Sequence, residues 1–106
     1  MQRLDELKHE WDEFAAQVRA GQLTPDTREA LAYWGSYARQ SLSRLAMDAS
    51  TGKISPAQAE QEAERVLSEA VGNVGVNLLS PALLGYVTSM GMTPVAYASQ
   101  VYRGRK

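Results

Sequence analysis

Hydrophobic positions near the start of the chain recur at the spacing of an amphipathic helix. Five bulky apolar side chains follow one another at alternating steps of three and four residues: Leu4, Leu7, Trp11, Phe14 and Val18. This spacing places them along one stripe, while charged residues fill the other faces. The pattern predicts a helix over residues 2–20, ending at Gly21, whose stripe packs in the chain's own core or, alternatively, in an intermolecular coiled coil.

Each of the four prolines follows a hydroxyl residue: Thr24-Pro25, Ser55-Pro56, Ser80-Pro81 and Thr93-Pro94. A Ser or Thr side chain accepts a hydrogen bond from a free N–H of a first helical turn, and the following proline lacks an N–H that would stay unpaired there. Gln58 adds a capping-box spacing to Ser55. The pairs predict helix starts at 25, 56, 81 and 94, the alternative being turns or kinase-type sites.

Apolar periodicity defines two further helices. The first covers residues 25–50, before Gly52, and its inward positions are Leu31, Trp34, Ala38, Leu42 and Leu45. The second covers residues 56–71, and its inward positions are Ala59, Ala63, Val66, Leu67 and Ala70. We therefore expect an all-α fold, a small bundle of four to five helices in one domain over residues 1–106. Residues 72–80 could continue a helix, form a loop or extend as a short strand.

Charge is unevenly distributed along the chain. Glu69 is the last acidic residue and Arg103 the next charged one, so residues 70–102 form 33 consecutive positions without Asp, Glu, Lys, Arg or His. A soluble surface normally carries charge on about a quarter of its positions. Most of the stretch is therefore expected to be covered by the core of the chain, by an oligomeric interface or by a membrane.

The composition of residues 70–102 bears on which environment covers them: the core, an oligomeric interface or a membrane. Its glycines and alanines let backbones approach closely, which favours an interface, and the expected contact residues are Leu78, Leu79, Leu83, Leu84, Tyr86 and Met90. Residues 71–92 have the length of a membrane span, about 20 residues, but Asn73, Asn77 and Pro81 interrupt it. The charged end of the chain, Arg103, Arg105 and Lys106, either keeps the apolar stretch in solution or docks onto phosphate.

The sequence contains few residues that could support catalysis. The chain has no cysteine and one histidine, His9, which lies on a charged helix face; a metal shared by His9 and Glu13 would lack further ligands. Glu60, Glu62, Glu64 and Glu69 resemble an exposed helix face more than a catalytic carboxylate pair. No nucleotide-binding, zinc-protease, serine-hydrolase or EF-hand motif occurs. We expect no enzymatic activity, no cofactor and no metal.

The leading hypothesis is a non-enzymatic structural or adaptor protein that assembles with itself or docks into a larger complex, by analogy a virion or a secretion machine. One alternative is a membrane-associated protein that inserts residues 71–102 as a multimer. Another is a small monomeric inhibitor or regulator that binds one protein. The net charge of −1 disfavours a nucleic-acid partner. Without an apolar leader, the protein is expected in the cytoplasm or within a macromolecular assembly.

Overall fold

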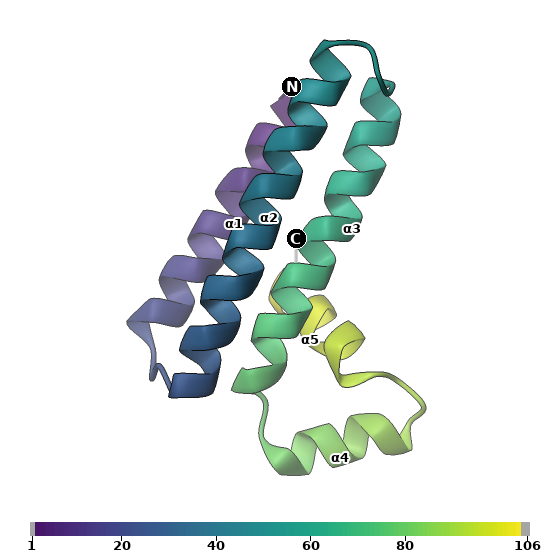
Figure 1. Cartoon of the computed structure of the whole chain (residues 1–106). Coiled ribbons are helices and arrows are strands. Elements are labelled where there is room, and N and C mark those ends of the chain that lie inside the picture. Colours follow the sequence, from purple (N-terminus) through teal and green to yellow (C-terminus); the bar gives the residue numbers. More distant parts are fainter. Residues whose placement is uncertain (1, 105–106) are drawn as a thin grey trace.

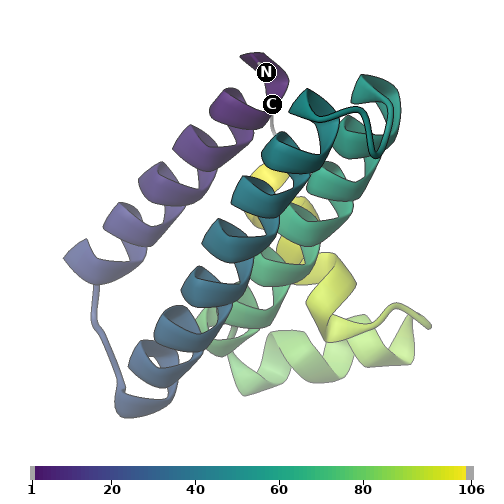
Figure 2. The same cartoon turned by 45° about the horizontal axis from the view of Figure 1, so that its top comes forward.

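The computed structural model describes residues 2–104 and shows an all-α bundle, as the sequence predicts. Its elements are α1 (Gln2–Ala20), α2 (Pro25–Ser50), α3 (Pro56–Gly75), the short 3-10 helix η1 (Val76–Leu78), α4 (Pro81–Ser89) and α5 (Pro94–Arg103). Helix α2 runs antiparallel to both α1 and α3, which are parallel to each other, and α5 lies against α3 (Figure 1). In both views α4 lies at the end of the molecule opposite the α2–α3 turn (Figures 1 and 2).

All four predicted helix starts are confirmed. The hydroxyls of Thr24, Ser55, Ser80 and Thr93 each accept a backbone N–H from the third helical residue, at donor–acceptor distances of 3.1–3.2 Å. At Ser55 the capping box is complete, because its backbone N–H donates to Oε1 of Gln58 at 2.9 Å. Local side-chain chemistry therefore determines where four of the five α-helices begin.

The core lies between α1, α2 and α3. All five apolar residues of the α1 stripe and all five predicted inward residues of α3 are buried. On α2, Leu31, Ala38 and Leu42 are buried, whereas Trp34 and Leu45 are only partly covered. The two helices α1 and α2 come close at Gly35, where a Cβ atom would lie 3.4 Å from the Trp11 ring.

Helix α3 is longer than the sequence predicts, and the expected end near residue 71 is wrong. The helix continues to Gly75 and then tightens into η1, so residues 72–78 are helical and do not form a strand. Asn73 and Asn77 support this turn, since their side-chain amides donate to the backbone oxygens of Glu69 and Asn73, at 2.8 and 3.2 Å. Within a helix, glycine lowers stability by about 1 kcal/mol relative to alanine. Close contact with α5 offsets this cost at Gly72 and Gly75.

Over the part of the chain that the structure describes, no helix is both long and apolar enough to cross a membrane. The stretch expected to insert in the membrane alternative, residues 71–102, is instead divided among the end of α3, η1, α4 and α5.

Candidate protein-interaction surface

The uncharged stretch does not have one uniform environment. Its first six residues, 70–75, belong to the end of α3, and five of them are buried in the bundle. The next seventeen residues, 76–92, comprise η1, α4 and the turn that follows, and we call them the uncharged arm. Of these seventeen, Val87 alone is buried. The core therefore covers the beginning of the uncharged stretch but leaves the arm largely open.

The structure places all six predicted contact residues on the arm. Tyr86 and Met90 protrude most, with 62% and 66% of their surface exposed, and Leu78 is 38% exposed. Leu79, Leu83 and Leu84 are half-buried. Two of the six are thus about two-thirds exposed, and the other four are covered to a greater extent.

Tyr86 and Met90 lie one helical turn apart and share a surface pocket. The pocket has a volume of about 160 Å3 and is lined by Tyr86, Val87, Met90, Met92, Tyr97 and Gln100. It lies between α4 and α5, and none of its lining residues carries a charge. Leu78 lies apart from this group, at the edge of a second hollow that it shares with Phe14, Val18 and Tyr102.

Two glycines of α3 allow α5 to pack closely against the bundle. The arm is positioned in turn by its contact with α5. A Cβ atom on Gly72 would lie 2.6 Å from the backbone oxygen of Val95, and one on Gly75 would lie 2.7 Å from the Tyr102 ring. The small residues that the sequence assigns to an intermolecular contact are, at these two positions, used for a contact within the chain. Gly91, with a φ of +81°, makes the turn that returns the chain from α4 to α5.

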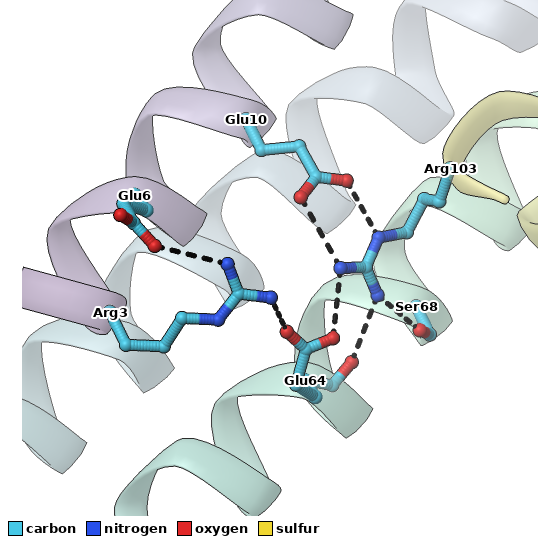
Figure 3. Close-up of polar contacts among 6 residues, drawn as sticks. All are labelled: Arg3, Glu6, Glu10, Glu64, Ser68 and Arg103. Carbon is cyan, nitrogen blue, oxygen red and sulfur yellow. Dashed lines mark hydrogen bonds and ion pairs between the residues drawn. The ribbon is translucent and has the colours of Figure 1, made fainter. Parts of the chain in front are cut away.

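A partly buried ion-pair cluster fixes the other end of α5 (Figure 3). Arg103 donates from Nε to Glu10 Oε2 at 2.7 Å and from Nη2 to Glu64 Oε2 at 2.9 Å. Its Nη1 also donates to the Ser68 hydroxyl. Arg3 reaches the other oxygen of Glu64. The Arg103 and Glu10 side chains are only 13% and 11% exposed, so these contacts join α1, α3 and α5 in a shielded place.

The contacts within the cluster favour the charged forms of Glu64 and Arg103. Burial alone would raise the pKa of Glu64, but hydrogen bonds from Arg103 and Arg3 outweigh burial and lower that pKa below its ordinary value. Burial likewise opposes the charge on Arg103, yet Glu10 and Glu64 outweigh it and raise the pKa of the guanidinium. At neutral pH Glu64 is therefore a carboxylate held between two arginine cations.

This arrangement changes what can be expected of the basic end of the chain. Arg103 was expected to dock anions from a solvent-facing tail, but its guanidinium is engaged by Glu10 and Glu64 inside the molecule. Its nitrogens make five hydrogen bonds within the molecule, so a phosphate that binds the guanidinium would have to replace some of these contacts. Arg105 and Lys106, the other two residues of the expected docking site, lie outside the described residues.

Sequence reasoning missed the cluster because it assigned Glu10 and Glu64 to exposed helix faces. One signal could have flagged Glu10, which follows Leu7 by three residues and precedes Phe14 by four, and so borders the buried stripe. His9 does lie in solvent, with Nε2 3.6 Å from Glu13 Oε1. Among residues 2–104, no three His, Asp or Glu side chains are grouped so that they could hold a metal ion.

Comparison of the chain with protein-family models, with curated proteins and with solved structures finds no match.

Proposed function

We propose that this chain is a non-enzymatic helical assembly protein, which associates through the uncharged arm with copies of itself or with a larger protein complex. The observation that carries the proposal is the combination of exposure and missing charge over residues 76–92. An exposed apolar patch bordered by polar surface is typical of protein–protein contact sites.

The energetic reason lies in the protruding side chains. Covering a Met or an aromatic side chain that was exposed contributes roughly 1.5–3 kcal/mol each. Tyr86 and Met90 are each about two-thirds exposed, and Met92 and Leu78 are each exposed by more than a third. Covering these four together would contribute about 3–6 kcal/mol from each copy or partner, which works against an association cost of about 4–15 kcal/mol and so favours a weak, reversible contact.

The charge pattern supports the same proposal. Asp, Glu, Lys and Arg make up 22% of the whole chain, yet all of these residues lie outside positions 70–102. Charged residues are depleted at the centres of protein–protein interfaces, whereas Tyr and Met are enriched there. The arm has this composition, and the outward faces of α1 to α3 do not.

A surface substitution tests the proposal better than a truncation. Cutting the chain after Glu69 would remove Val71 and Val74 from the core and α5 from its contact with α3, so the bundle would be damaged together with the arm. Tyr86→Glu instead changes one exposed position. Tyr33→Glu is a matched control, because Tyr33 on α2 is 65% exposed and Tyr86 is 62% exposed.

The measurement is light scattering after size exclusion, combined with fluorescence of a dye that binds exposed apolar surface. We expect a mass above 11.6 kDa, or a monomer that binds the dye, and in either case Tyr86→Glu removes the effect while Tyr33→Glu keeps it. A monomer at high concentration that binds no dye would contradict the proposal.

A further inference from the structure

We infer that the partner of the uncharged arm is a second copy of this chain, and that the two α4 helices meet across a two-fold axis. This inference rests on the proposed function and adds to it the identity of the partner and the symmetry of the contact.

Charge is the first argument for a second copy. In a two-fold contact each surface faces an identical surface, so any charged group near the axis meets a like charge. The arm carries no Asp, Glu, Lys, Arg or His, so two copies meet there without repulsion. The charged residues Asp26 and Glu29 approach the arm beside Asn77, at its η1 end, and not at Tyr86 or Met90.

The position of α4 makes such a contact accessible. The helix lies at one end of the molecule, opposite the α2–α3 turn, and it contacts mainly α5 (Figures 1 and 2). Two copies can therefore approach end to end while their charged helices α1 and α2 stay in solvent.

The number of exposed residues in and beside the arm suits a reversible dimer. A standard interface takes about 800 Å2 and 20–30 residues from each partner. The arm offers sixteen residues that are at least partly exposed, and Tyr97 and Gln100 of α5 extend it along the pocket. These eighteen residues are slightly fewer than a standard interface takes from each partner, so the dimer is expected to dissociate on dilution.

Protruding side chains and a pocket also lie side by side on this surface. Tyr86 and Met90 protrude, and beside them the uncharged pocket has a volume of about 160 Å3. An apolar cavity of about 150 Å3 is large enough to hold a benzene ring. A two-fold contact can thus place an apolar side chain of each copy in the pocket of the other.

Single cysteines test the symmetry, because the chain contains none of its own. Ala82→Cys, Gly85→Cys and Ser89→Cys each place one thiol on an exposed position of α4, and Ser36→Cys and Ser43→Cys on exposed positions of α2 are controls. A disulfide needs Cα atoms about 4.4–6.8 Å apart, so a single-cysteine chain links to itself only near a two-fold axis.

Under mild oxidation we expect one of the three α4 variants to form a covalent dimer in at least about tenfold higher yield than the α2 controls. The yield of the other two α4 variants should fall with their distance along the helix from that position. A dissociable oligomer that no α4 cysteine links would overturn the two-fold contact while the proposed assembly function stands. A monomer that still binds the apolar dye would overturn the second copy as partner. A monomer without dye binding would overturn both.

Discussion

Arg103 at the end of α5 forms a two-point ion pair with Glu10 of α1, 93 residues earlier in the chain, through Nε at 2.7 Å and Nη2 at 3.3 Å. Both side chains are almost completely shielded from solvent. Because α4 contacts mainly α5, this pair also helps to position the uncharged arm relative to the bundle.

Replacing Arg103 should therefore destabilise the protein. Arg103→Met keeps most of the volume but removes the guanidinium that donates to Glu10, Glu64 and Ser68, and we expect a loss of about 3 kcal/mol in the free energy of unfolding. Urea denaturation followed by circular dichroism measures it. Arg44→Met, on an exposed position of α2, should change stability by less than about 0.5 kcal/mol. Equal effects of the two substitutions would show that the cluster contributes nothing.

Acid should weaken the same cluster through Glu64. Its pKa is lower in the folded chain than its ordinary value of 4.5, so its contribution is present above the unfolded pKa and is lost as the pH falls through the folded pKa. Glu64→Gln should therefore be less stable than the unchanged protein at pH 7, and the difference should shrink below pH 4.5. Thermal melts from pH 7 to pH 2.5 test this, with the exposed Glu60→Gln as the control. A constant difference across that range would contradict the role of Glu64.

Two glycines should respond to alanine in opposite directions. At Gly72 the new methyl group would meet the Val95 backbone 2.6 Å away, and we expect a loss of about 1–3 kcal/mol of stability. At Gly85 it would meet nothing within 4 Å, so the better helix propensity of alanine should add about 0.5–1 kcal/mol. Urea midpoints of dilute protein compare them. A Gly72→Ala variant as stable as the original would mean that α5 does not fit tightly against α3.

The helix starts could be predicted because they depend on neighbouring residues alone. A hydroxyl followed by proline favours a helix start through local hydrogen bonding, and Thr24, Ser55, Ser80 and Thr93 all cap a helix here. The end of α3 could not be predicted in the same way. Gly72 and Gly75 have low helix propensity, and what favours glycine there lies more than twenty residues later in α5: the Val95 backbone beside Gly72 and the Tyr102 ring beside Gly75.

The candidate surface was partly predictable. The missing charge marked residues 70–102 as an unusual stretch, and two of the six contact residues predicted from it, Tyr86 and Met90, are among the most exposed apolar side chains. It could not separate residues 70–75, which complete the core, from the arm, because both are apolar and uncharged. The ion pair between Arg103 and Glu10 could not be predicted from the sequence pattern either, because it depends on how α5 folds back across α3.

Opposite charges at position 90 should restore association that either charge alone removes. Across a two-fold contact, Met90→Glu places a carboxylate near its own counterpart, and Met90→Lys does the same with an ammonium group. Each variant alone should be monomeric, whereas an equimolar mixture should form a heterodimer, with stronger recovery at low salt. Native mass spectrometry distinguishes the species. A mixture that stays monomeric would argue that the two copies of residue 90 do not lie close together.

The most direct test of the account is the mass of the protein across a dilution series, measured by light scattering. Met47→Glu is the matched control for Met90→Glu, because these methionines are 65% and 66% exposed on α2 and on the arm. The account predicts that the unchanged chain and Met47→Glu rise from 11.6 kDa toward twice that mass with concentration, while Met90→Glu stays at 11.6 kDa. Equal masses for Met90→Glu and the unchanged chain at every concentration would contradict it.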